Sequence, residues 1–175
     1  DKQQANRGIH MDTPEKNRAM QMLQYGVYVL SAQAEEDQAA AAVVSWVTQA
    51  SFSPPLLVAA LRVGWRIHTV VQQAQAYTIN ILDRQHTSVA RTFFDTVWGK
   101  GGTLAGERFH SGATGAPILD CAAGYIECKL DLCLEKGDHS IFVGEVADAG
   151  TTGNIVGRPD EVGLLLRDFG VFYGG

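Results

Sequence analysis

Residues 125–146, YIECKLDLCLEKGDHSIFVGEV, contain the pattern that best defines the fold of this chain. Apolar and other side chains alternate over the first ten residues, as they do in a β-strand with one face in water. The next four residues, EKGD, combine a glycine with charged side chains and are typical of a tight turn. Residues 141–146, IFVGEV, then resume strand character, which predicts an antiparallel hairpin.

Further segments on both sides of this hairpin also have strand character. Charged residues at 35–37 and the break SPP at 53–55 separate the upstream ones. The small residues 39–42 would suit a helix equally well, but they lie between two strand signals and we interpret them as strand. The predicted strands are residues 25–32, 39–47, 56–61, 77–82 and 164–172.

Short helices are predicted between some of these strands. An N-cap pattern at Asp12 predicts a helix to about Gln24, which we expect to pack as a lid or arm. Apolar residues at helical spacing predict two more, over residues 67–74 and 89–94, the second with Thr87 as a candidate N-cap.

Residues 99–115 are rich in glycine and have no steady period, so we expect a long loop, a feature that is usually functional or mobile in a compact domain. The chain has no internal repeat. Six or so strands with only short helices predict a mainly β protein, an antiparallel β-barrel with short helices.

The chain of 175 residues has the size of one domain and can bury a core without disulfides or metal. It is 46% hydrophobic and 19% charged, as in globular proteins. His10 and Met11 look like the junction of an expression tag. We therefore interpret residues 1–20 as tag remnant and N-terminal arm or helix, and residues 21–175 as the folded domain.

Charge and cysteine content exclude several classes of function. The net charge is −5 and no basic run is interleaved with aromatic residues, so we expect no nucleic-acid partner. No apolar stretch reaches the roughly 18 residues that a membrane span needs. The three cysteines form no Cys-x-x-Cys pair, which favours a reducing cytoplasm. They are Cys121, Cys128 and Cys133.

Residues 45–55, SWVTQASFSPP, place hydroxyls and an amide along a segment that two prolines terminate. We expect a bent loop there, able to offer several neutral donors to one anionic or heterocyclic ligand. This segment resembles the flavin-binding loop of the flavin reductase family. Its amino-acid sequence is similar to that of the same loop in the flavin reductase-like domain of some flavodiiron proteins. Many members of that family have Asn and Ser at the positions of Ser45 and Trp46.

Three more segments resemble the family in the same order along the chain. Residues 77–82, YTINIL, are similar to a strand whose Asn lies near the flavin. The Gly-Asp-His sequence that ends at His139 is similar to a hairpin whose His reaches the flavin or the nicotinamide. Residues 107–119 are similar to the loop before the second sheet. The resemblance implies an FMN-binding split barrel of Greek-key strands.

The same resemblance implies the residues of the site. His139 is the expected catalytic residue and also a cofactor contact. Arg66 and Thr69 are expected at the flavin phosphate, chosen from a group that also held Arg84 and Arg91. The remaining expected cofactor contacts are Ser45, Trp46, Val47, Thr48, Gln49, Ala50, Ser51, Asn80, Ile81 and Leu82.

Most of these residues also have a structural interpretation. The hydroxyls of Thr48 and Ser51 would by default bond their own backbone. Trp46 fits a core, a flavin contact or a subunit interface. Asn80 stands in an apolar strand where its amide needs partners, and we expect a ligand to be one of them.

The other histidines and the cysteines carry no such prediction. His68, His86 and His110 lack the spacing of a zinc site, so we expect solvated surface positions and no metal. Cys128 alternates with apolar residues, which favours packing in the core or an interface over redox chemistry.

The resemblance implies an NAD(P)H-dependent flavin reductase that binds FMN, with FAD less expected, works as a homodimer and delivers electrons to a partner protein or oxygenase. Hydride passes from nicotinamide to flavin, so the protein supplies position and polarity. The 99–115 loop would gate nicotinamide entry. One alternative is an FMN-carrying electron-transfer module without nicotinamide oxidation, in keeping with a domain cut from a longer chain. Another is a binding protein for a different heterocycle.

Overall fold

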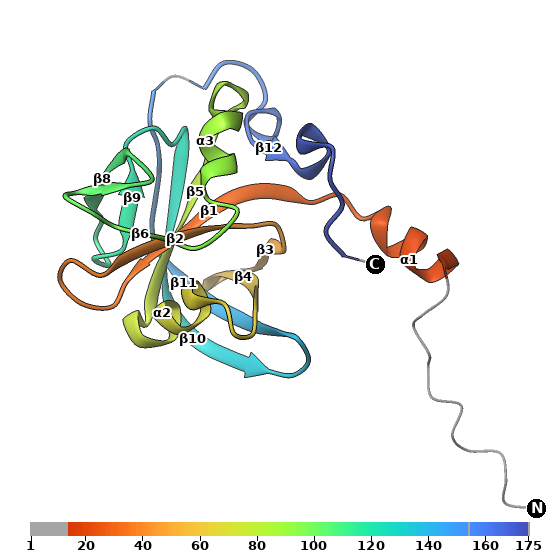
Figure 1. The fold of residues 1–175 in the computed structure, drawn as a ribbon, viewed down its shortest axis with the longest axis horizontal. Coiled ribbons are helices and arrows are strands. Elements are labelled where there is room, and N and C mark those ends of the chain that lie inside the picture. The colour runs from red at the N-terminus through yellow and green to blue at the C-terminus, as the bar shows by residue number, and fades with distance from the viewer. Residues whose placement is uncertain (1–13, 154, 175) are drawn as a thin grey trace, which may run out of the picture.

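The computed structural model describes residues 14–153 and 155–174, so the expected tag junction lies outside the described residues. Two antiparallel sheets and a few short helices make up this part of the chain (Figure 1). The larger sheet contains β1 (Gly26–Gln33), β2 (Ala39–Val44), β3 (Val47–Phe52), β4 (Pro55–Arg62), β5 (Ala76–Ile81), β6 (Val97–Trp98), β10 (Gly124–Glu135), β11 (His139–Thr151) and β12 (Leu164–Leu165). The smaller sheet contains β7 (Thr103–Leu104), β8 (Glu107–Ser111) and β9 (Pro117–Leu119).

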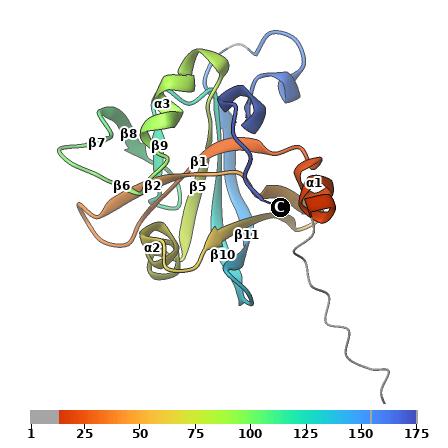
Figure 2. The same ribbon diagram turned by 45° about the vertical axis from the view of Figure 1, so that its right-hand side comes forward.

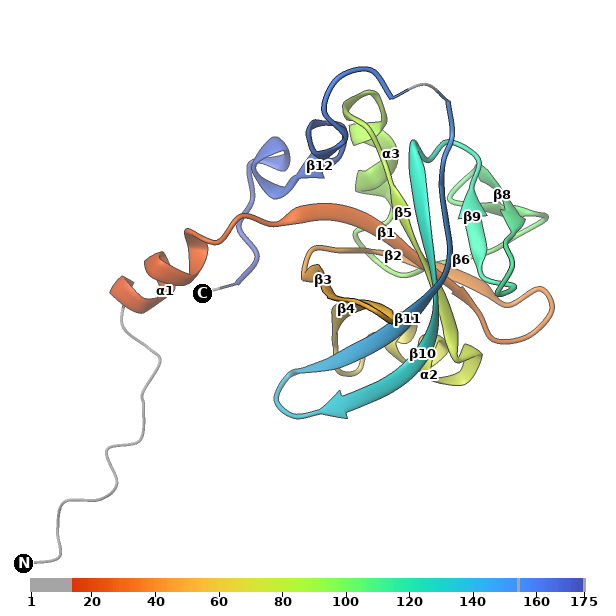
Figure 3. The same cartoon turned by 180° about the vertical axis from the view of Figure 1, so that it is seen from behind.

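The larger sheet runs in the order β3-β4-β11-β10-β5-β1-β2-β6, with β12 paired to β1. Side chains from β4, near one end of this order, and from β2, near the other end, share one hydrophobic core with β5, β10 and β11. The sheet therefore curls around that core as a barrel, which confirms the mainly β fold. Figure 3 shows the β10–β11 hairpin crossing the barrel, with its turn projecting at one end.

Helix α2 (Arg66–Ala74) and helix α3 (Thr87–Thr92) lie toward opposite ends of the barrel (Figure 2). The first contributes Ile67, Val70 and Val71 to the main core, and Ala90 of the second belongs to another core, with Phe93 and Leu104. Helix α1 (Pro14–Gln21) extends away from the body and buries none of its residues (Figure 1). The 3-10 helices are η1 (Arg84–His86), η2 (Pro159–Glu161) and η3 (Leu166–Phe169).

The predicted strands over residues 25–32, 39–47 and 77–82 and the hairpin of residues 125–146 are all present within a few residues. The expected helix to Gln24 is present as α1, which ends at Gln21, and its expected N-cap at Asp12 lies outside the described residues. Among residues 14–153 and 155–174, no helix is long and apolar enough to cross a membrane.

The bent loop expected at residues 45–55 is wrong in part, because residues 47–52 form β3. This strand pairs with β4 through Val47 opposite Ala59 and Gln49 opposite Leu57, with a bulge before Ser51. It lies at the end of the sheet order and exposes Thr48 through Ala50 to solvent. The side chains that an edge strand turns toward water are polar. The sequence of β3 is therefore polar as well, and it did not show the apolar pattern by which a strand is recognised.

The long loop expected at residues 99–115 is also wrong. This stretch holds β7 and β8, and the residues before, between and after these two strands form turns and short connections. Gly101, Gly102 and Gly106 adopt φ of 58°, 75° and 88°, values that suit tight turns. Strands of two to five residues are too short to produce a readable period.

Two predictions about element ends are corrected as well. Only Leu164 and Leu165 of the expected strand at 164–172 are extended, because the chain turns into η3 and leaves it through Gly170 at φ 66°. Thr87 is the first residue of α3 rather than its cap, and its hydroxyl donates to the Arg84 carbonyl. The N-cap of α3 is His86, without a side-chain cap bond, and the Asp83 carboxylate caps the preceding η1 by accepting from the Gln85 amide.

Candidate functional site

An apolar cavity of about 310 Å³ lies between one end of the barrel and the residues that follow β12. The ends of β2 and β4 form one wall, and Phe94 and Trp65 contribute aromatic surface. Residues 171–173 line the cavity from the other side. Ser45 and Arg62 add polar groups to this lining, a combination typical of small-molecule sites.

Three rings gather where this cavity meets the start of β11. The Trp46 ring lies 4.5 Å from the His139 ring and 5.2 Å from the Tyr173 ring, measured between centroids. A hydrogen bond of 2.7 Å joins His139 Nε2 to the Tyr173 hydroxyl, and one of 2.9 Å joins His139 Nδ1 to the Asp138 carboxylate. Both ring nitrogens of His139 are therefore held. Trp46, His139 and Tyr173 are called the ring cluster below.

The indole N–H of Trp46 is buried and has no hydrogen-bond partner among the described residues. A buried donor without a partner costs about 1–3 kcal/mol, so native proteins rarely keep one without a reason. The ring that carries this donor lies against His139 and Tyr173, and Tyr173 lines the cavity. The arrangement suits a ligand with a hydrogen-bond acceptor.

Two ionisable groups of this region, Asp138 and Tyr173, have shifted pKa values. The hydrogen bond from His139 lowers the pKa of Asp138, so this carboxylate stays ionised beside the imidazole. Burial raises the pKa of Tyr173, so its hydroxyl stays protonated at neutral pH. The Tyr173 hydroxyl and the Trp46 indole are thus neutral hydrogen-bonding groups, with the Asp138 carboxylate on the other side of the His139 ring.

The structure brings Trp46 and His139 together and places Ser45 in the lining of the cavity, but it does not bring the rest of the predicted loop to either place. Thr48, Gln49 and Ala50 are exposed on β3, while Val47 and Ser51 are half-buried. The Thr48 hydroxyl donates to the Gln49 carbonyl, and the Gln49 amide donates to the Ser51 carbonyl. In this structure these side chains stabilise their own strand.

Asn80 has hydrogen-bond partners for both its amide nitrogen and its oxygen within the protein, so it does not depend on a ligand to satisfy them. Its amide donates to the Val29 carbonyl at 3.1 Å and to the Ser31 hydroxyl at 2.8 Å, and its oxygen accepts from the Leu119 amide at 2.8 Å. Asn80 thus ties β1 and β9 to β5. Of its predicted neighbours, Ile81 is half-buried, and Leu82 is buried in the core beneath α3.

Arg66 and Thr69, the expected phosphate residues, are exposed on α2. Arg66 lines a separate hollow of about 290 Å³ together with Asp95 and Trp65. Trp65 lines both this hollow and the apolar cavity, so Arg66 lies next to the candidate site rather than inside it.

His68 is not the surface residue that the sequence suggested. It is buried, its Nε2 lies 2.8 Å from the Ser140 hydroxyl, and its ring meets the edge of Phe142. His86 and His110 are more exposed and pair with Asp83 and Asp120.

No group of three or more potential metal ligands occurs among residues 14–153 and 155–174. Cys128 is fully buried in the main core, as predicted, and burial raises its pKa to about 11. A thiol that remains protonated at neutral pH makes a poor nucleophile.

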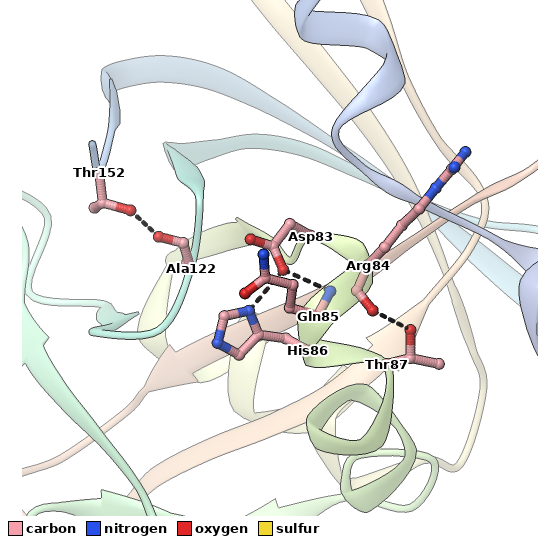
Figure 4. A network of polar contacts seen from close by, with 7 residues as sticks. All are labelled: Asp83, Arg84, Gln85, His86, Thr87, Ala122 and Thr152. Carbon is pink, nitrogen blue, oxygen red and sulfur yellow. Dashed lines mark hydrogen bonds and ion pairs between the residues drawn. The ribbon is translucent and has the colours of Figure 1, made fainter. Parts of the chain in front are cut away.

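A second, polar cavity of about 730 Å³ lies beside η1. Figure 4 shows the network there, in which the Asp83 carboxylate bonds His86 at 2.8 Å and Thr152 bonds the Ala122 carbonyl. The guanidinium of Arg84 points away from the Asp83–His86 pair. No residue of the ring cluster lines this cavity.

Sequence reasoning missed three residues of the apolar site, namely Arg62, Trp65 and Tyr173. Trp65 directly precedes the predicted Arg66, so the turn before α2 could have been read as a site element. Tyr173 offered no signal, because it reaches His139 across 34 positions of the chain.

The model of the family named flavin reductase like domain matches residues 20–169. The diflavin flavoprotein A 1 of Synechocystis is 28% identical over 157 residues, which cover 89% of this chain and 26% of that protein. The reductase component of the 4-nitrophenol 4-monooxygenase/4-nitrocatechol 2-monooxygenase of Rhodococcus opacus is 34% identical over 114 residues, covering 65% of this chain and 60% of that protein.

The solved structure of the NADH:FAD oxidoreductase SgcE6 from Streptomyces globisporus is similar, with a TM-score of 0.70, 25% identity and coverage of 86% of each chain. The chain spans about a quarter of the length of the diflavin flavoproteins that it matches. The family model covers most of the chain and the barrel has the expected split-barrel fold. On this evidence, the chain belongs to the flavin reductase like family of oxidoreductases.

Proposed function

We propose that this domain is an NAD(P)H-dependent reductase that holds FMN beside the ring cluster and passes its electrons to a partner protein. The observation that carries the proposal is the unpartnered indole N–H of Trp46 next to His139, in a chain of the flavin reductase like family. A flavin ring presents carbonyl and nitrogen acceptors, so its chemistry fits this donor. Bound flavin would supply the hydride acceptor for a reduced nicotinamide.

The residues of the chain would bind and orient the cofactor. Ser45 and the walls of the apolar cavity suit a flat heterocycle, and His139 would position it from the start of β11. Donors along residues 47–51 would stabilise negative charge on reduced flavin, and Ile81 and Leu82 would contribute through the adjoining backbone. Arg66 and Thr69 remain our candidates for the phosphate, since Arg66 adjoins Trp65.

The expected assembly is a homodimer. Leu132, Leu134 and Ile141 are 54%, 49% and 39% exposed, and they share one face of the β10–β11 hairpin with Val143. Contiguous exposed apolar side chains mark an interaction surface, and a second copy of this chain is the partner we propose. The free thiols of all three cysteines are in keeping with a cytoplasmic protein.

The relatives support two versions of this function, which differ in how the electrons are received and passed on. The Rhodococcus relative is the reductase component of a monooxygenase, which favours an oxygenase partner. The diflavin flavoproteins, and the high molecular weight rubredoxin of Moorella thermoacetica, favour an FMN-carrying electron-transfer module. Such a module would lack its own nicotinamide oxidation.

The test is a titration of the purified protein with FMN and with FAD, followed by anaerobic addition of NADH and then NADPH. Binding of FMN that bleaches with either nucleotide supports the reductase, whereas binding without bleaching supports the electron-transfer module. Absence of binding by either flavin would overturn the proposal.

A matched pair of variants tests the site itself. Trp46→Phe keeps an aromatic ring but removes the donor, and we expect it to weaken FMN binding about two- to tenfold. Trp98→Phe, on β6 and outside the cavity, should bind as the wild type does. Equal affinity of the two variants would remove Trp46 from the site.

A further inference from the structure

Residues 171–174 lie against the site that the proposed function assigns to flavin. Val171, Phe172 and Tyr173 line the apolar cavity, and the Tyr173 ring packs on Trp46. The position of Gly174 is close as well, since a Cβ built on it would lie 3.3 Å from the Trp46 ring. The 171–174 segment therefore covers both the cavity and the indole.

The cavity is small for its proposed occupant. Its volume of about 310 Å³ falls at the lower limit of ligand sites, which span roughly 300–1,000 Å³. Three consecutive residues of the lining belong to the 171–174 segment, so withdrawal of this segment would enlarge the cavity and open it to solvent.

The segment is also weakly anchored. After β12, which pairs with β1 at only two residue pairs, the chain forms the short η3 and then has no regular structure from residue 171 onward. Phe172 is 75% exposed and contributes little packing. The specific polar contact of the segment is the 2.7 Å bond between the Tyr173 hydroxyl and His139.

The unpartnered indole shows that the covered arrangement is not optimal for Trp46. Tyr173 packs on this ring and satisfies His139, yet it leaves the Trp46 N–H without an acceptor. A ligand that takes the place of Tyr173 and offers an acceptor would satisfy a donor that the segment cannot.

From these contacts we propose that Tyr173 is an autoinhibitory side chain that occupies the position of the flavin ring, and that the 171–174 segment must withdraw for FMN to bind. The inference rests on the proposed flavin site. The bond between Tyr173 and His139 holds the closed state, so weakening that bond shifts the population toward the open state. A ligand of the open state then binds more tightly, because less of its binding energy is spent on opening.

The test compares Tyr173→Phe with the wild type in two measurements. Tyr173→Phe removes the bond to His139 but keeps the ring, and we expect the FMN dissociation constant to fall about two- to tenfold, the range that one hydrogen bond allows. Tyr125→Phe is the matched control. It also loses a hydroxyl bond, to Asp148 on the β10–β11 hairpin, and should bind FMN as the wild type does.

The second measurement needs no flavin. Acrylamide quenching of the Trp46 emission, obtained as the difference between each protein and its Trp46→Phe counterpart, reports how far the indole is covered. We expect stronger quenching in Tyr173→Phe than in the wild type. Unchanged quenching together with unchanged or weaker FMN binding would overturn the inference. If quenching rises but no variant binds FMN, the segment is a cover and the proposed flavin function is the part that fails.

Discussion

At the scale of single residues, Glu127 illustrates how a buried charge can be fully satisfied by the chain. Its side chain is completely buried, and its carboxylate accepts from the amides of Ala113 and Thr114 and from the Thr114 hydroxyl, at 2.6–2.9 Å. Gly112 packs directly against it. Charged acceptors bonded in this way stabilise a loop strongly, because the bonds are charge-assisted.

We therefore expect Gly112→Ala to lower the free energy of unfolding by about 1–3 kcal/mol, since an added Cβ would lie 2.3 Å from the carboxylate and displace its bonds. Chemical denaturation measures the change. Gly163→Ala is the control, as its Cβ would meet Ile81 at an ordinary 3.6 Å. Equal stabilities of the two variants would show that the loop yields without cost.

Buried His68 gives the protein a pH dependence. Burial lowers the pKa of His68 below the ordinary 6.5. Just below pH 6.5, the unfolded chain therefore binds a proton at this residue that the folded chain does not bind. The surrounding groups are Ser140, Gln72 and Glu135, and the last two partly oppose this shift. The contribution of His68 to stability is thus complete above pH 6.5 and is lost as the pH falls below it.

Replacement by glutamine removes this titration. We expect the wild type to lose more stability than His68→Gln between pH 7 and pH 5, in urea denaturation at each pH, although His68→Gln is less stable at pH 7. His86→Gln, a half-buried histidine paired with Asp83, serves as the control. Parallel stability curves for the wild type and His68→Gln would contradict the assignment.

At the scale of elements, β5 carries two buried polar side chains, of which one is hydrogen-bonded and the other is not. Asn80 bonds β1 and β9, whereas the Thr78 hydroxyl is buried without a partner among the described residues. The two stand two positions apart on one strand, so they share a face. Because only one of them is hydrogen-bonded, their substitutions should differ in their effect on stability.

We expect Asn80→Ala to destabilise the protein by about 2–4 kcal/mol, because three hydrogen bonds are lost and the Leu119 amide is left without an acceptor. Thr78→Val should be neutral or stabilising by up to about 1 kcal/mol, because a hydroxyl that nothing satisfies is replaced by a methyl group. Thermal and chemical denaturation test the pair. A large loss of stability in Thr78→Val would reveal a partner for its hydroxyl.

Strands that bury a regular face were predictable from sequence, and strands that do not were missed. The strand over residues 77–82 and the β10–β11 hairpin follow directly from their apolar pattern. The strand β3 has an exposed polar side, and β7 and β8 are too short for a period, so local composition could not identify them.

The same reasoning explains how much of the candidate site was found. Ser45, Trp46 and His139 belong to segments whose sequences resemble the family. The fold brings Trp46 against His139 and places Ser45 in the cavity lining. Arg62 and Tyr173 enter the site only because β4 and the 171–174 segment meet there in space. No spacing along the chain encodes that meeting.

At the scale of the whole molecule, the exposed apolar face of the β10–β11 hairpin, formed by Leu132, Leu134 and Ile141, is the surface that we expect a partner to cover. In the proposed homodimer, this face would be covered by a second copy. We expect Leu132→Glu with Leu134→Glu to shift the protein from dimer to monomer in light scattering after gel filtration. Val156→Ser, at an 89% exposed position elsewhere, should leave the mass unchanged. A wild type that is monomeric would refute the proposed assembly.

The short pairing of β12 has a consequence for kinetics. Only the pairs Gly26–Leu165 and Val27–Leu164 fasten this strand to β1, and the residues beyond it wall the cavity. Regions held by so few bonds open far more often than the barrel does, and their amides exchange with solvent early. If ligands enter only when this wall opens, the observed rate of FMN binding in stopped flow should stop rising with FMN concentration and level off at the opening rate. The lifetime of the closed 171–174 segment would then set how fast the proposed cofactor binds.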